Sequence, residues 1–168
     1  MSIMCCNLAY TAENRYTIND SSVFITSKPL TGRWIKGFKA AQEAIVYSKG
    51  KCPGSCLGAA IFNGNRLLAT GFNTKTKTKP HNVVIKTDGT GYSITTHAEQ
   101  AAVDKVKYII SEESYNSIRL IMYVVRLNAF GKFVCSKPCN MCRDYIKQYG
   151  IKTVRFINDN GLPEEMTL

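Results

Sequence analysis

The chain has 168 residues, which suits one domain with a buried core, and it has no run approaching the ~18 uninterrupted apolar residues of a membrane-spanning helix. Its seven cysteines are an odd number without dense spacing, and no signal peptide is expected, so reduced thiols in a cytoplasmic protein are favoured over a secreted disulfide scaffold. The net charge of +10, from 22 basic and 12 acidic residues, favours phosphate-bearing partners, from nucleotides to nucleic acids, with a merely solvated basic surface as the alternative.

The first half of the chain predicts a helix followed by a hairpin. A β-branched run at 23–26 would suit a short edge strand, and apolar side chains recur at helical spacing over 34–48. Within 57–73, two apolar runs flank an Asn-Gly-Asn sequence, and this pattern predicts a β-hairpin because both turn residues tolerate positive φ. The polar segment 74–91, rich in Lys, Thr and Gly, predicts a long functional loop.

The second half predicts helices and strands in alternation. The elements are a helix over 97–110, a strand over 118–127 that 130–134 extends or pairs with, a helix over 139–149 and a strand over 151–157. This order predicts an α/β fold with three layers, α/β/α, around a mixed sheet that closes with a parallel crossover. We expect a single domain over 1–168, with its core at about 34–157 and residues 1–30 as an N-terminal extension.

Two short motifs carry the chemistry: His97-Ala98-Glu99 and Pro138-Cys139-Asn140-Met141-Cys142. Each is expected at the start of a helix, where the helix dipole favours thiolates. A catalytic zinc ion takes three protein ligands from imidazoles and thiolates and keeps a fourth position for water. His97, Cys139 and Cys142 could supply those ligands, and Glu99 could act on the water as a general base.

Each motif alone has other readings. A lone C-x-x-C sequence also suits a redox pair, but nothing in this chain looks like a thioredoxin-type start. It also suits half of a structural zinc site, for which Cys135 would be the candidate fourth ligand. Taken together and in this order, the motifs match the H-x-E…P-C-x-x-C signature of zinc deaminases.

From Trp34 to Ile157 the chain resembles the cytidine and deoxycytidylate deaminase superfamily, through the hairpin sequence LGAAIFNGNRLLATGFN, THAEQAAV and SKPCNMCRDYIKQYGIKTVRF. The resemblance implies a five-stranded mixed sheet with helices on both faces. Its last strand would be parallel, as in the deoxycytidylate and transfer-RNA adenosine deaminase branch. It also implies that His97, Cys139 and Cys142 bind one catalytic zinc, that Glu99 moves the protons, and that the chain forms a homo-oligomer.

Six further residues are candidate substrate contacts: Asn73, Ala98, Lys137, Lys75, Lys77 and Tyr92. The resemblance implies that Asn73 contacts the sugar or base and that Ala98 offers a backbone contact to the base edge. The two loop lysines alternate with threonines and could form a phosphate-binding edge, or be solvated only. Tyr92 could pack against a base or in the core. Lys137 stands where many polynucleotide-editing relatives have Ser, and the insertion before Pro138 is longer than usual.

A second, structural zinc is a further hypothesis. Its candidate ligands are Cys52, Cys56, His81 and Cys135. Spacing alone leaves free thiols and an exposed loop histidine as the alternative reading.

The resemblance implies hydrolytic deamination of a cytosine nucleotide, dCMP to dUMP, in which water activated by zinc attacks C4 and ammonia leaves. The alternative is a polynucleotide editor that acts on cytosine in single-stranded DNA or RNA, or on adenosine in tRNA, and the high net charge fits that alternative. A catalytically inactive zinc-fold binding module is a third reading, against which the intact Glu99 argues.

Overall fold

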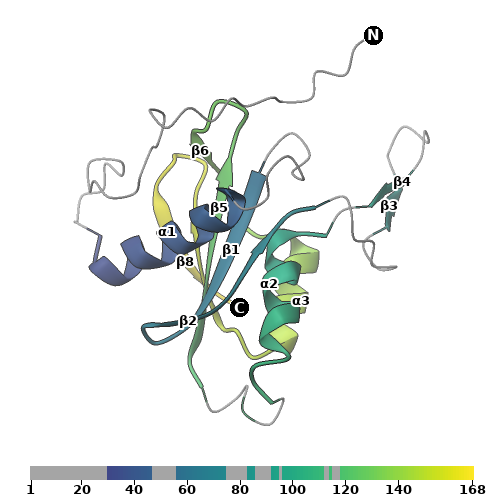
Figure 1. Ribbon diagram of the computed structural model, residues 1–168. Helices are drawn as coiled ribbons and strands as arrows, with labels where there is room; N and C mark the ends of the chain where they lie inside the picture. Colours follow the sequence, from purple (N-terminus) through teal and green to yellow (C-terminus); the bar gives the residue numbers. More distant parts are fainter. Residues whose placement is uncertain are drawn as a thin grey trace.

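The computed structural model describes residues 30–46, 56–74, 83–85, 92–94, 96–111, 114 and 118–168 (Figure 1). In chain order, the elements are α1 (Gly32–Val46), β1 (Cys56–Asn63), β2 (Arg66–Phe72), β3 (Val83–Ile85), β4 (Tyr92–Ile94), α2 (Ala98–Val106), β5 (Leu120–Leu127), β6 (Phe133–Val134), α3 (Asn140–Gln148), β7 (Thr153–Ile157) and β8 (Pro163–Thr167). The edge strand expected at 23–26 lies outside the described residues.

The described strands form one mixed sheet of six strands and one small hairpin. The sheet has the order β2-β1-β5-β7-β8, and β6 pairs with β5. Only β5 and β7 run parallel, from Ile121 opposite Thr153 to Tyr123 opposite Arg155, and the other pairs in the sheet are antiparallel. The mixed α/β fold is therefore confirmed, and so is the parallel direction of the strand expected at 151–157.

The sheet differs from expectation by one strand, since six are present where five were expected. β7 is not the last strand, because β8 follows it and pairs with it antiparallel. The connecting turn is built around Asn158, whose Oδ1 accepts the N–H groups of Asn160 and Leu162 at 3.0 and 2.9 Å. Gly161 adopts φ +76° in this turn, a conformation that glycine reaches without strain.

Helices cover both faces of the sheet, which gives the three layers predicted (Figure 1). Alternate residues of β1 point to opposite faces, as the strand period requires. Ala60 and Phe62 pack with α1 in one buried cluster, while Ala59 and Ile61 pack with α2 and α3 in the other. None of the described helices is long and apolar enough to cross a membrane.

Two sequence predictions need correction between 74 and 110. The segment 74–91 is not a loop throughout, because β3 lies within it and pairs antiparallel with β4. The helix expected to reach residue 110 ends at Val106, and residues 107–109 form a turn.

Gly71 in β2 allows the N-terminus of α2 to pack closely against the sheet. A Cβ atom at Gly71 would collide with the carbonyl oxygen of Ala98 and the amide nitrogen of Ala102. The absence of a side chain therefore lets α2 lie directly against β2. This close approach fixes the first turn of α2, where His97 and Glu99 lie, relative to the sheet.

Candidate active site

His97 is the residue that caps the N-terminus of α2. Its backbone is extended, with φ −73° and ψ 153°, so the residue lies just outside the helix. Its N–H donates to Oε1 of Gln100 at 3.4 Å, which satisfies one donor at the helix start. The preceding Thr96 forms a two-bond bridge with Thr74, with N···O distances of 2.9 and 3.1 Å. The histidine backbone is thus held from both sides.

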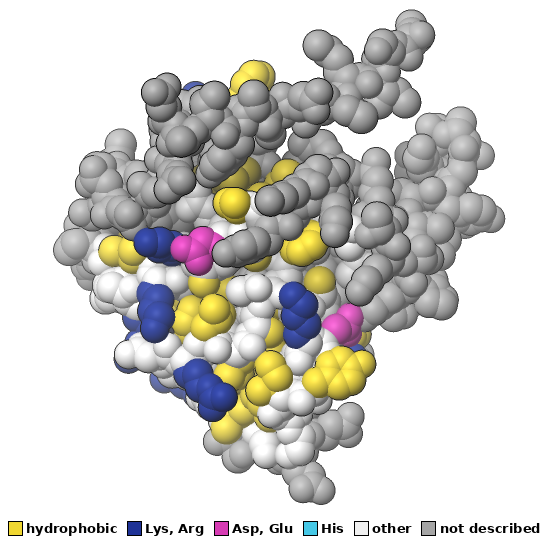
Figure 2. Space-filling model, viewed as in Figure 1, with side chains coloured by type: hydrophobic (Ala, Val, Ile, Leu, Met, Phe, Trp, Pro, Cys, Tyr) yellow, Lys and Arg dark blue, Asp and Glu magenta, His cyan; other side chains and the backbone are white. Residues whose placement is uncertain are grey.

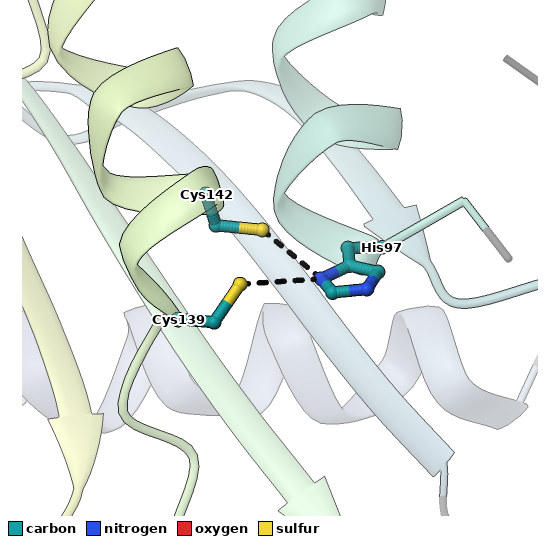
Figure 3. A group of neighbouring side chains, drawn as sticks. All are labelled: His97, Cys139 and Cys142. Atoms are coloured by element: carbon teal, nitrogen blue, oxygen red, sulfur yellow. Dashed lines mark hydrogen bonds between the residues drawn. The ribbon is translucent and has the colours of Figure 1, made fainter. Parts of the chain in front are cut away.

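Cys139 and Cys142 belong to the first turn of α3. Cys139 caps the helix with extended backbone angles, φ −66° and ψ 164°, and its side chain is exposed. Cys142 is one turn further on and fully buried. The spacing of three residues brings both sulfurs to the side of α3 that faces α2, as the C-x-x-C pattern predicted (Figure 3).

The two helix starts meet at one point (Figure 3). Nδ1 of His97 lies 3.1 Å from Sγ of Cys142 and 3.7 Å from Sγ of Cys139. The three ligand atoms lie within 4.8 Å of one another, and no other such group of His, Cys, Asp or Glu occurs among the residues that the structure describes. The structure therefore brings together the three residues predicted as metal ligands.

The chemistry of these three residues fits a zinc ion. Hydrogen bonds from Cys142 and His97 lower the pKa of Cys139 to about 4, while its own hydrogen bond to Cys139 and burial raise the pKa of Cys142. The hydrogen bond with Cys139 also raises the pKa of His97. Two thiolates and an imidazole are a typical ligand set for catalytic zinc, and a bound dication would displace the thiol protons.

Glu99 lies beside this group and is only 2% exposed. Its Oε2 is buried and has no hydrogen-bond partner among the described residues. Burial raises the pKa of Glu99, and the charge of His97 and a hydrogen bond with Cys142 oppose that rise. A buried carboxylate oxygen without a partner costs free energy, so its retention beside three metal-binding groups indicates a ligand or water that it serves.

The candidate substrate contacts are described only in part. Asn73 follows β2 and is 8% exposed; its Oδ1 accepts the N–H of Leu57 at 2.7 Å, so the side chain is fixed at the strand end. Ala98 is fully buried at the start of α2, and Lys137 is exposed two residues before Cys139. The remaining three, Lys75, Lys77 and the side chain of Tyr92, lie outside what the structure describes.

The structure describes only two of the four residues predicted as ligands of a second zinc ion. Cys52 and His81 lie outside the described residues. Cys56 begins β1 and Cys135 follows β6, and both are half-buried cysteines. Among the described residues neither joins a metal-binding group. A second metal site is therefore not proposed.

Two polar residues near the site, Gln100 and Ser136, were not predicted from the sequence. Gln100, which is fully buried, binds the backbone of His97. Its position three residues after a helix cap is a capping-box signal that the sequence does carry. Ser136, which is 2% exposed, joins two strands just before Cys139. No local pattern reveals it, because its partners are distant in sequence.

Known proteins resemble the chain in sequence and in fold. The sequence model of the cytidine and deoxycytidylate deaminase zinc-binding region matches residues 34–158. No curated protein matches the chain. Among solved structures, a cytidine deaminase from Burkholderia pseudomallei is 18% identical over 76% of this chain and 90% of its own, with a TM-score of 0.50. That likeness shows the fold.

Two further solved structures are similar to the chain. A cytidine deaminase from Mycobacterium leprae is 22% identical over 79% of this chain and 92% of its own, with a TM-score of 0.49. The dCMP deaminase from the cyanophage S-TIM5, in complex with dCMP and dUMP, is 25% identical over 68% of this chain and 74% of its own, with a TM-score of 0.43.

Proposed function

The chain belongs to the cytidine and deoxycytidylate deaminase family of zinc-dependent hydrolases, and from this membership we propose that it converts the nucleotide dCMP to dUMP and ammonia. The observation that carries the proposal is the buried, unpartnered Oε2 of Glu99 beside the cluster of His97, Cys139 and Cys142. This arrangement supports Glu99 as the proton-transfer group and the other three residues as the metal ligands.

In this proposal Nδ1 of His97 and the sulfurs of Cys139 and Cys142 hold the zinc ion. When bound, zinc acts as a Lewis acid that lowers the pKa of a water molecule towards about 7. Glu99 takes a proton from the attacking water and gives it to the ring nitrogen N3, while the water oxygen bonds to C4 of cytosine. Glu99 then takes the remaining water proton from the new C4 hydroxyl and gives it to the amino group. The C4–N4 bond breaks, and ammonia leaves.

The other proposed contacts are to the sugar, the base and the phosphate of the substrate. Asn73, fixed at the end of β2, would contact the sugar, and the backbone at Ala98 would contact the base edge. Lys75, Lys77 and Lys137 would face the phosphate, with Tyr92 against the base. The net charge of +10 supports an anionic substrate over a neutral nucleoside.

The same charge supports a second candidate function, the editing of single-stranded DNA or RNA or of tRNA. Figure 2 shows basic side chains scattered among polar and apolar ones on the described part of one face, without a continuous basic track. Proteins that follow a single strand combine such a track with stacked aromatic residues. We therefore rank the free nucleotide first.

A substrate panel tests the two candidates. The purified protein is offered dCMP, CMP, cytidine, dCTP, single-stranded DNA and tRNA, and ammonia and the product base are measured. Turnover of dCMP with none of either polynucleotide is the expected result. Turnover of DNA or tRNA without turnover of dCMP would establish the editing function instead. Zinc-loaded protein that acts on none of them would favour an inactive binding module.

The assembly is a separate proposal. We propose a homo-oligomer, as the family resemblance implies. Light scattering on the purified chain should give a mass at least twice that of one chain, and a mass equal to one chain at assay concentration would refute the proposal.

A further inference from the structure

Ser136 joins the two parallel strands of the sheet through three hydrogen bonds. Its Oγ donates to the carbonyl oxygen of Val124 at 2.7 Å and accepts from the N–H of Ile157 at 2.9 Å. Its own N–H donates to the carbonyl oxygen of Ile157 at 2.8 Å. The residue is 2% exposed, so these bonds are made in a dry environment where an unmade one is costly.

The position of Ser136 in the sheet explains why a hydroxyl is needed there. Direct parallel pairing between β5 and β7 ends at Tyr123 and Arg155. At the next residues the serine enters between the two strands, binding Val124 on one and Ile157 on the other. A hydroxyl can donate to one strand and accept from the other at once, which an alanine or valine cannot do.

The segment after Ser136 leads directly to the candidate metal site. Only Lys137 and Pro138 separate it from Cys139. Pro138 is buried, and its ring fixes φ, so the connection has little freedom to move. Cys139 lies outside the helix proper and is exposed, whereas Cys142 is held by the core. Packing therefore fixes Cys142. Cys139 is held on one side by the bond from the N–H of Arg143 to its carbonyl oxygen, at 2.9 Å, and on the other side by the segment before it.

We propose that Ser136 is a positioning residue for the metal site: it anchors the start of α3 to β5 and β7 and so keeps Sγ of Cys139 within reach of His97. The inference rests on the proposed function in one respect, that His97, Cys139 and Cys142 bind zinc. Residues that orient metal ligands in this way affect metal affinity as well as stability.

Two variants separate positioning from general stability. Ser136→Ala removes the hydroxyl, so the N–H of Ile157 and the carbonyl oxygen of Val124 each lose the hydrogen bond that they make with it. Tyr123→Phe is the matched control, because it likewise removes one hydroxyl, that of a buried residue in β5 which accepts from Nη1 of Arg155. Tyr123 packs in the cluster on the α1 side, on the opposite face from the metal site.

The measurements are zinc affinity by competition with a chelating indicator, the absorption spectrum of the cobalt-substituted protein, and the melting temperature without metal. We expect Ser136→Ala to bind zinc about 10-fold more weakly or worse, with a shifted cobalt spectrum. Tyr123→Phe should bind as the unmodified protein does, although both variants melt at lower temperature. A spectrum and an affinity unchanged in Ser136→Ala would overturn the inference, and so would an equal loss of affinity in Tyr123→Phe.

The unmodified protein and Cys139→Ala distinguish the two proposals. If the unmodified protein takes up no zinc, or if Cys139→Ala binds zinc as tightly, the assignment of the metal ligands fails. If both behave as expected and only the result for Ser136→Ala disagrees, the ligands stand and the positioning role fails alone.

Discussion

Nδ1 of His97 lies 3.1 Å from Sγ of Cys142, although 45 residues separate them in sequence. Each residue is fixed by its own helix, and the two helices meet through the core that they share with the sheet. Cys142 is fully buried in that core, so the metal site and the fold are built from the same contacts. Changes near the site must therefore be tested for stability and for metal content as well as for turnover.

Glu99→Gln should abolish turnover and keep the metal. Gln has the same shape but cannot accept and return a proton, and proton transfer by a positioned side chain is typically worth about 10²-fold to 10⁴-fold in rate. Because the Oε2 it replaces is buried without a described partner, the variant should be as stable as the unmodified protein or more so. Ammonia release, zinc content and thermal unfolding check the three expectations. Loss of zinc from Glu99→Gln would mean that Glu99 is a ligand.

Cys139→Ser and Cys142→Ser should each lose most of the bound zinc, but only one should weaken the metal-free fold. Cys142 is fully buried, and a more strongly hydrated hydroxyl there, even with Nδ1 of His97 as its partner, should lower the free energy of unfolding by about 1 kcal/mol. Cys139 is exposed, so its replacement should change that free energy by less than about 0.5 kcal/mol. Zinc content and urea unfolding in excess chelator provide the comparison. Equal destabilisation by the two variants would contradict the burial difference.

The parts of the site that depend on local spacing could be predicted from the sequence. His97 and Glu99 lie two residues apart, Cys139 and Cys142 lie three apart, and each pair begins a helix as expected. The distance between the pairs is a tertiary property, and it could be expected only from resemblance to a family. The layers and the parallel strand pair followed from the alternation of helical and strand-like segments.

Three features could not be predicted because their causes are long-range or because the local sequence shows no pattern. β8 has the sequence PEEMT, with charged residues side by side, so it shows no alternation, and its pairing with β7 alone makes it a strand. Ser136 looks like a loop residue, since its partners are 12 and 21 positions away. The hairpin of β3 and β4 was missed because each strand has only three residues, too few to show a strand pattern.

Gly71→Ala should destabilise the protein by disturbing the close contact between α2 and β2. The new methyl group would collide with backbone atoms of Ala98 and Ala102, which cannot rotate away as a side chain could. Overpacking of this kind typically costs about 1–3 kcal/mol. Gly32→Ala is the matched control, because nothing lies within 4 Å of a Cβ atom there. Urea unfolding should show a loss for Gly71→Ala alone, with weaker zinc binding because His97 moves with the helix start. Equal stability of the two variants would refute the close approach.

Tyr145→Phe should destabilise the protein at pH 8 and much less at pH 12. The hydroxyl of Tyr145 accepts from Nζ of Lys107 and donates to Asp104, both at 2.7 Å, and this network ties α3 to α2. Loss of these bonds at a half-buried position should cost about 1 kcal/mol at pH 8.

The pH dependence follows from the phenol. Burial, together with Asp104, raises the pKa of Tyr145 to about 12, and Lys107 opposes that rise. A raised pKa means that the folded state favours the neutral phenol. Its contribution is therefore complete below the ordinary pKa near 10 and is lost as the pH rises towards 12. The difference in unfolding free energy between the unmodified protein and Tyr145→Phe should shrink over that interval. Tyr108→Phe, at a side chain that is 92% exposed, is the control and should be as stable as the unmodified protein at pH 8. A difference for Tyr145→Phe that stays constant from pH 8 to 12 would show that its hydroxyl does not titrate in this network.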